Sequence, residues 1–158
     1  MNEYMDVAID LSDDNFDKAY GGPFGACIVK DGKIIGKGIN RVIKDHDPTA
    51  HAEVTAIRNA CKNLGTHDLS GCELYTSCYP CPMCLSAIIW ANIKTVYYGN
   101  TKEDAADIGF RDEFIYDFLE KLSKNKEDDK TLDLNQMDRD KALEVFNRYK
   151  QDKDKIEY

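Results

Sequence analysis

The chain has 158 residues, of which 42% are hydrophobic and 32% charged, and its formal net charge is −8. This length and composition predict one globular domain over residues 1–158 with no membrane-spanning segment, because no apolar run approaches the roughly 20 residues that cross a bilayer. Proteins that bind a nucleic-acid backbone usually carry a basic face, so the acidic balance argues against nucleic acid and favours a small molecule as the partner.

The N-terminus is acidic and lacks the basic and apolar regions of a signal peptide, which predicts a cytoplasmic protein. Residues 3–19 carry apolar side chains at helical spacing, so we expect an amphipathic helix that ends at residues 21–23, Gly-Gly-Pro. Two β-strands are expected next, at residues 24–30 and 33–39. The Asp-Gly pair between them predicts a hairpin with a tight turn of the primed type.

The next helix is expected to begin at Asp47 and Pro48, because aspartate is a good N-cap and proline suits the first helical position. It would continue to Leu64 and be stopped by Gly65. A strand at residues 72–77 is expected to follow it and to lead the chain toward a cysteine-rich segment.

The rest of the chain continues the alternation of helices and strands. A helix that begins at Pro80 or Pro82 and ends near Ala91 should be followed by a strand at residues 95–99. The later expected elements are a helix at 112–122, a short strand at 132–137, a helix at 138–149 and a charged tail at 150–158.

Helices that alternate with strands after an initial hairpin indicate an α/β protein. We expect a three-layer α/β/α arrangement, in which helices cover both faces of a mixed five-stranded sheet.

Six cysteines could form disulfides in a small secreted protein, but this chain is too long and too rich in core residues for that interpretation. Cys27, Cys61 and Cys72 are expected to be small buried side chains on strands or helices. Cys78 is expected to pack in the same way, because as a fourth metal ligand it would close the site described next.

Two motifs carry ligands for a metal ion, His51 with Glu53 and Cys81 with Cys84. One imidazole and two thiolates suit tetrahedral Zn²⁺, and three protein ligands leave a fourth position open, as in catalytic zinc sites. Cys81 and Cys84 lie one turn apart at an expected helix start, where exposed amides and the helix dipole favour thiolates. We therefore expect one zinc ion per chain.

Glu53 is expected to carry protons for a zinc-bound water. Zinc in an open site can lower the pKa of that water to about 7, and general acid–base groups contribute about 10²–10⁴ in rate. His-x-Glu followed by Pro-Cys-x-x-Cys is a known signature of zinc deaminases, which indicates hydrolytic deamination of an amidine-like ring carbon. A Cys-x-x-Cys pair alone also suits a redox or structural role, so a non-catalytic zinc or thiol module is the alternative of another class.

The chain resembles the cytidine deaminase-like superfamily of zinc deaminases and, within it, the short bacterial guanine deaminases. The zinc motif carries the resemblance to the superfamily, and the flanking segments carry the resemblance to the guanine deaminases. The resemblance covers most of residues 20–120, in four segments: 21–26, 47–61, 75–85 and 109–116.

This resemblance implies that His51, Cys81 and Cys84 hold Zn²⁺ and that Glu53 is the proton shuttle. It implies attack of water at C2 of guanine, with xanthine and ammonia as the products, a reaction of purine salvage and catabolism.

Four substrate-binding residues are also implied by the resemblance. Phe24 would stack on the purine, whose other face would meet the ring of His51. Asn40 would hydrogen-bond the base, and Asp112 would accept from the N1–H and 2-amino groups. The resemblance also implies a homodimer in which the C-terminal segments, here residues 150–158, are swapped between subunits. Tyr158 would then close the site of a partner subunit.

The chain departs from the family pattern at Tyr79, where the family usually has glutamate. Related deaminases use the same zinc chemistry on other substrates, so the alternative substrates are guanosine, an aminotriazine, cytosine and tRNA adenosine. The acidic net charge argues against tRNA among these.

Overall fold

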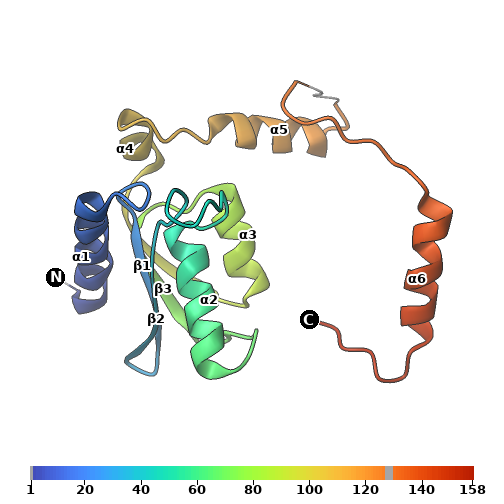
Figure 1. Cartoon of the computed structure of the whole chain (residues 1–158), viewed down its shortest axis with the longest axis horizontal. Coiled ribbons are helices and arrows are strands. Elements are labelled where there is room, and N and C mark those ends of the chain that lie inside the picture. Colours follow the sequence, from blue (N-terminus) through green and yellow to red (C-terminus); the bar gives the residue numbers. More distant parts are fainter. Residues whose placement is uncertain (1, 127–129) are drawn as a thin grey trace. The chain divides into compact units, whose positions relative to one another are not determined.

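The computed structural model describes residues 2–126 and 130–158. They form two compact units, one that ends at Tyr116 and one that begins at Asp117 (Figure 1). The elements in chain order are α1 (Glu3–Lys18), β1 (Gly25–Lys30), β2 (Lys33–Ile39), α2 (Ala52–Leu64), β3 (Glu73–Cys78), α3 (Pro82–Trp90), β4 (Thr95–Asn100), α4 (Lys102–Asp107), α5 (Glu113–Ser123) and α6 (Arg139–Gln151).

The first unit is built on a mixed sheet with the strand order β2-β1-β3-β4. β1 is antiparallel to both β2 and β3, whereas β3 and β4 are parallel. Asp31 and Gly32 in the β1–β2 turn both have positive φ, 49° and 73°, which confirms the primed turn predicted from the Asp-Gly pair.

The sheet has four strands in the described part of the chain, so the prediction of five strands was wrong. Residues 132–137, expected as the fifth, have no regular secondary structure. Leu132, Leu134 and Met137 are 53%, 63% and 81% exposed. A few apolar residues do not make a strand by themselves, because a strand is stabilised by a paired edge and by side chains packed against it.

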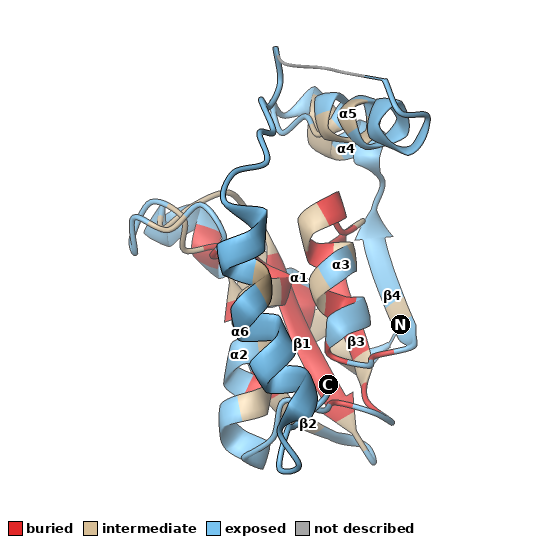
Figure 2. Cartoon of the chain, turned by 90° about the vertical axis from the view of Figure 1, so that its right-hand side faces the viewer, coloured by how far each residue is buried: buried red, intermediate tan, exposed pale blue. Residues whose placement is uncertain are grey.

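Helices cover both faces of the sheet, which gives the three α/β/α layers (Figure 1). Side chains alternate along buried β1: Ala26 and Ile28 face the cluster with α2 and α3, whereas Cys27 and Val29 face α1. β1 is buried along most of its length, as Figure 2 shows. The core between the sheet and α2 therefore positions α2, the helix that carries Glu53.

Helix α2 packs directly on the backbone of β2. A Cβ atom added to Gly36 or Gly38 would lie 2.7 Å and 2.2 Å from the carbonyl oxygens of Ala56 and Ala52, respectively. Side chains at these two strand positions would push the helix away from the sheet. The glycines therefore bring the first turn of α2 close to the strand that ends next to Asn40.

The start of α2 differs from the prediction, because the helix begins at Ala52 and not at Asp47 and Pro48. The carboxylate of Asp47 accepts hydrogen bonds from the Thr49 backbone N–H at 2.8 Å and from its hydroxyl at 2.7 Å. This Asx-turn competes with helix formation, so the chain turns here and enters the helix four residues later. His51 consequently becomes the N-cap residue of α2.

Helix α4 was not predicted. It is short and begins with a capping box, in which the Thr101 side chain accepts from the Asp104 backbone N–H and the Asp104 carboxylate accepts from the Thr101 N–H. Its Thr-x-x-Asp spacing was the available sequence signal.

The second unit contains the end of α5, then α6 and the C-terminal segment. None of its described residues is buried, and α6 carries exposed Val145, Phe146 and Tyr149. In the described part of the chain, no helix is both long and apolar enough to cross a bilayer.

Candidate active site

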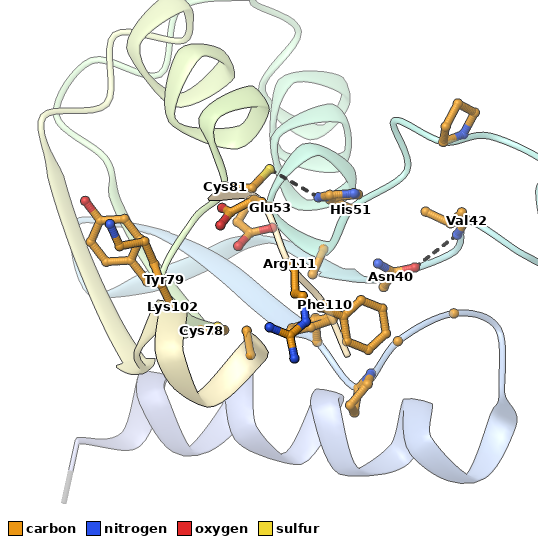
Figure 3. Close-up of a pocket in the computed structure, with 18 of the residues that line it drawn as sticks. Asn40, Val42, His51, Glu53, Cys78, Tyr79, Cys81, Lys102, Phe110 and Arg111 are labelled. Carbon is orange, nitrogen blue, oxygen red and sulfur yellow. Dashed lines mark hydrogen bonds between the residues drawn. The ribbon is translucent and has the colours of Figure 1, made fainter. Parts of the chain in front are cut away.

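Three side chains form a candidate metal site where the N-termini of α2 and α3 meet, and Figure 3 shows two of them, His51 and Cys81. His51 and Cys81 are the N-cap residues of these helices, and neither side chain caps its own helix. The Nδ1 atom of His51 lies 3.5 Å from the Sγ atoms of both Cys81 and Cys84. The structure thus brings together the three residues that the sequence singled out as ligands.

The spacing of these atoms suits a tetrahedral zinc ion. With Zn–N and Zn–S bonds of about 2.05 and 2.3 Å, two such ligands lie about 3.6 Å apart. Hydrogen bonding from Cys84, with further stabilisation by His51, holds the pKa of Cys81 well below that of a free thiol. The same contact with Cys81, together with burial, raises the pKa of Cys84. A dication would favour the thiolate form of both, so this donor set fits zinc.

Cys78 is not a fourth member of this group among the described residues. Its buried thiol lies 3.6 Å from the carbonyl oxygen of Thr101, and burial raises its pKa to about 11. A protonated, buried thiol is a packing residue, which agrees with the expectation for Cys78.

Glu53 lies beside the metal group and is only 6% exposed. One carboxylate oxygen accepts from the Thr76 hydroxyl at 2.9 Å, and the other lies 3.3 Å from the Sγ atom of Cys84. Burial raises the pKa of this carboxyl, and the hydrogen bonds from Thr76 and Cys84 oppose the rise. A carboxyl that is held in place and more basic than usual is suited to accept and return a proton.

Thr76 is a functional candidate that the sequence reasoning missed. It is fully buried in the middle of β3, and its hydroxyl also lies 3.1 Å from the carbonyl oxygen of Cys78. The sequence gives little sign of this role, since Glu73 and Ser77 are also polar residues of β3 and the partner Glu53 is 23 positions away.

The metal group opens into a cavity of about 650 Å³ that is lined by residues of the first unit. His51, Glu53 and Cys81 lie together at one side of it, with Asn40 and Phe110 nearby (Figure 3). Phe24 and Asp112 line it as well, so the structure brings three of the four expected substrate-binding residues to the cavity. The fourth, Tyr158, belongs to the second unit and is 85% exposed.

Asn40 is positioned to donate a hydrogen bond into this cavity. Its Oδ1 atom accepts from the Val42 backbone N–H at 3.1 Å, which leaves its side-chain NH₂ group to donate. A Cβ atom on Gly21 would lie 1.9 Å from this same oxygen, so a glycine is required there. Buried Asn15, which the sequence reasoning missed, donates to the carbonyl oxygens of Asn40 and Gly22 at 3.0 and 2.8 Å and joins the loop to α1.

Phe24 has an aromatic neighbour in the cavity wall. The ring of Phe110 meets it edge to face, with 5.0 Å between the centroids. A Cβ atom on Gly22 would lie less than 3 Å from both rings. Phe110 was not singled out from the sequence, but it limits how the Phe24 ring can turn.

Asp112 precedes α5 and is half-buried. Burial raises the pKa of its carboxyl, and the charge of Lys102 opposes that rise. Lys102, Arg111 and Tyr79 also line the cavity, and Tyr79 is the residue at which the chain departs from the family pattern.

Residues 1–100 match the family model for the cytidine and deoxycytidylate deaminase zinc-binding region. A guanine deaminase from Bacillus subtilis (strain 168) is 46% identical over 155 residues, which are 98% of this chain and 97% of that protein. The X-ray structure of a guanine deaminase from Bacillus subtilis matches with a TM-score of 0.91 and 46% identity, over 100% of this chain and 99% of that one.

Two more distant relatives cover part of the chain. A tRNA-specific adenosine deaminase from Agrobacterium fabrum is 44% identical over 91 residues, 56% of this chain and 60% of that protein. The crystal structure of a mutant protein in complex with 8-azaguanine is 36% identical and covers 69% of this chain and 63% of that one, with a TM-score of 0.66. The family match, the fold and the zinc-ligand geometry agree, and the chain belongs to the zinc-binding cytidine and deoxycytidylate deaminase family.

Proposed function

We propose that this protein is a guanine deaminase that hydrolyses guanine at C2 to xanthine and ammonia. The observation that carries the proposal is the cavity, which joins the open ligand set of His51, Cys81 and Cys84 to Glu53 and to Asp112. The likeness to a guanine deaminase over nearly the whole chain supports the choice of substrate.

Guanine fits the polarity of the proposed contacts. Its O6 and N7 atoms are hydrogen-bond acceptors, which suit the NH₂ group of Asn40. Its N1–H and 2-amino groups are donors, which suit the carboxylate of Asp112. Phe24, supported by Phe110, supplies a flat apolar surface for the ring, and the imidazole of His51 would meet the other face.

The proposed chemistry depends on proton transfer by Glu53. Zinc held by His51, Cys81 and Cys84 would supply an activated water as the nucleophile. The carboxylate of Glu53 takes a proton from that water and delivers it to a ring nitrogen as the new C2–O bond forms. It then transfers the second proton to the amino group, and the C2–N bond breaks to release ammonia. The hydrogen bond from Thr76 holds the carboxylate for both transfers.

A substrate panel tests this proposal. The zinc-loaded protein is incubated with guanine, guanosine, an aminotriazine, cytosine and a tRNA that carries the wobble adenosine, and ammonia release is measured. We expect turnover of guanine well above all the others. Turnover of cytosine or tRNA without guanine would overturn the proposal in favour of another deaminase, and a zinc-loaded protein inert toward the whole panel would favour a non-catalytic zinc module.

A homodimer with swapped C-terminal segments is part of the same proposal. The second unit has no buried residue among those described, which is untenable for a free unit of this size, and α6 and Ile156 carry exposed apolar side chains. We therefore propose that residues 1–158 act as one domain completed by a second copy, with Tyr158 at the partner's site. None of the six cysteines forms a disulfide, and two of them are proposed zinc ligands, which supports a reducing compartment, the cytoplasm.

Deletion of residues 156–158 is expected to lower kcat/KM for guanine about tenfold or more, because base-stacking and closing contacts of one aromatic residue contribute about 1–3 kcal/mol. The thermal midpoint should fall only slightly, since most of the apolar side chains that a partner would cover lie on α6 and remain. A decisive test mixes the truncated chain with full-length Glu53→Gln chain under conditions that exchange subunits. A swap predicts that the mixture recovers part of the activity that each lacks. A mixture as inactive as its components would show that each tail serves its own subunit.

A further inference from the structure

Lys102 has an unusual place at the edge of the cavity. Its Nζ atom lies 4.7 Å from the ring centroid of Tyr116 and 5.4 Å from that of Tyr79. Figure 3 shows the side chains of Lys102 and Tyr79 next to each other in the cavity wall. Aromatic faces attract an ammonium group at these distances, so the two rings limit where this otherwise exposed charge can be.

Helix α4 itself does not explain a lysine at this position. Lys102 is the first residue of α4, where the helix dipole favours an acidic side chain, and the next two residues, Glu103 and Asp104, are acidic. A lysine at this position slightly destabilises the start of the helix. Any favourable interaction of Lys102 therefore comes from the groups around its ammonium.

The group that gains from this charge is Asp112. Tyr116 follows Asp112 by four residues, and its backbone N–H donates to the Asp112 carbonyl oxygen at 3.3 Å, so Asp112 begins the helical turn that carries Tyr116. The charge of the ammonium held over the Tyr116 ring acts on the Asp112 carboxyl and lowers its pKa. Both Lys102 and Asp112 line the cavity, so this charge acts at the proposed substrate edge.

Tyr79 completes the arrangement. Its ring packs edge to face on Tyr98, with 4.9 Å between centroids, and its backbone N–H donates to the carbonyl oxygen of Asn100. A glutamate at this position would compete with Asp112 for the ammonium. The neutral ring of Tyr79 instead holds Lys102 by a cation–π contact and adds no negative charge that would compete with Asp112.

We infer that Lys102, held between Tyr79 and Tyr116, is a positioning residue that keeps the Asp112 carboxylate charged and aimed at the N1–H and 2-amino edge of the base. The inference rests on the proposed function and adds a specificity residue to it. Its effect is on the choice among purines and not on the proton transfers of Glu53.

The test compares Lys102→Met, Lys102→Arg and a control, Lys94→Met, all zinc-loaded. Lys94 is exposed and does not line the cavity. The inhibition constants of 8-azaguanine and unsubstituted purine are measured against guanine turnover, together with KM and kcat. 8-Azaguanine has the N1–H and 2-amino donors and the O6 acceptor of guanine, whereas purine has none of them. The O6 contact to Asn40 is the same in all three variants, so a change in the ratio of the two constants between variants reports on Asp112.

We expect Lys102→Met to lower the preference for 8-azaguanine over purine about fivefold, because a partly exposed charge pair contributes up to about 1 kcal/mol. KM for guanine should rise with it and kcat should change less. Lys102→Arg should restore the preference, since arginine keeps the charge and the aromatic contacts. An unchanged ratio in Lys102→Met, or an arginine variant as poor as the methionine one, overturns the inference while guanine turnover by the wild type still upholds the proposed function. A wild type with no preference for 8-azaguanine and no guanine turnover would overturn both.

Discussion

Replacing Glu53 by glutamine is expected to lower kcat for guanine about 10²–10⁴-fold while zinc stays bound. Glutamine has nearly the same shape and can still accept a hydrogen bond from Thr76, but it cannot take a proton from water. The metal ligands are His51, Cys81 and Cys84 in the proposal, so the ion should not depend on the carboxylate.

The measurement is steady-state turnover of guanine alongside zinc content per chain. The matched control is Glu73→Gln, since Glu73 lies on β3 outside the cavity and its carboxylate accepts from the Tyr75 hydroxyl at 2.9 Å. The control should keep both zinc and activity. A Glu53→Gln protein that turns guanine over at the wild-type rate would remove Glu53 from the chemistry, and one that loses zinc would make it a structural residue of the metal site.

Replacing Asp112 by alanine is expected to lower kcat/KM for guanine roughly a hundredfold, because hydrogen bonds to a charged group contribute about 1.5–3 kcal/mol and the lost carboxylate leaves two base donors without an acceptor. Asp112→Asn should lower kcat/KM for guanine nearly as much, since its amide NH₂ group can face the N1–H and 2-amino donors of the base. Zinc content should be unchanged in both.

Glu113→Ala is the control for this pair of variants. It removes the adjacent carboxylate, which is exposed and does not line the cavity, so guanine turnover should change little. Comparison by kcat/KM for guanine and by zinc content separates recognition from metal loss. If Asp112→Ala were as active as Glu113→Ala, Asp112 would have no role in binding the base.

Lys102 affects the pH at which Asp112 can bind guanine. The pKa of Asp112 is raised by burial and lowered by Lys102, so loss of the lysine should allow protonation of the carboxyl at a higher pH than in the wild type. Cys81 and Glu113 act in the opposite direction to Lys102 on the same group. Recognition of guanine that depends on ionised Asp112 is present above its pKa and is lost as the pH falls through it.

Short-range patterns were enough to locate the chemistry. The ligands are three or fewer residues from a helix start, and the Asp-Gly turn and the glycine after α2 obey local backbone rules that hold in any fold. For this reason His51, Glu53, Cys81 and Cys84 could be named from the chain alone, and the structure brings all four together.

The tertiary structure decided the features that depend on distant partners. Thr76 orients Glu53 from 23 residues away, and Lys102 reaches rings that belong to two other segments. The strand predicted at 132–137 does not form, because pairing with a sheet edge cannot be predicted from these residues alone. The helix does not start at Asp47, because the Asp47 carboxylate accepts a hydrogen bond from the Thr49 backbone N–H in a turn. The amino-acid sequence determined which groups could do the chemistry, since ligand type and local spacing are chain properties. Only the packed fold decided which neighbours orient and charge those groups, since contact energies depend on distance in space and not along the chain.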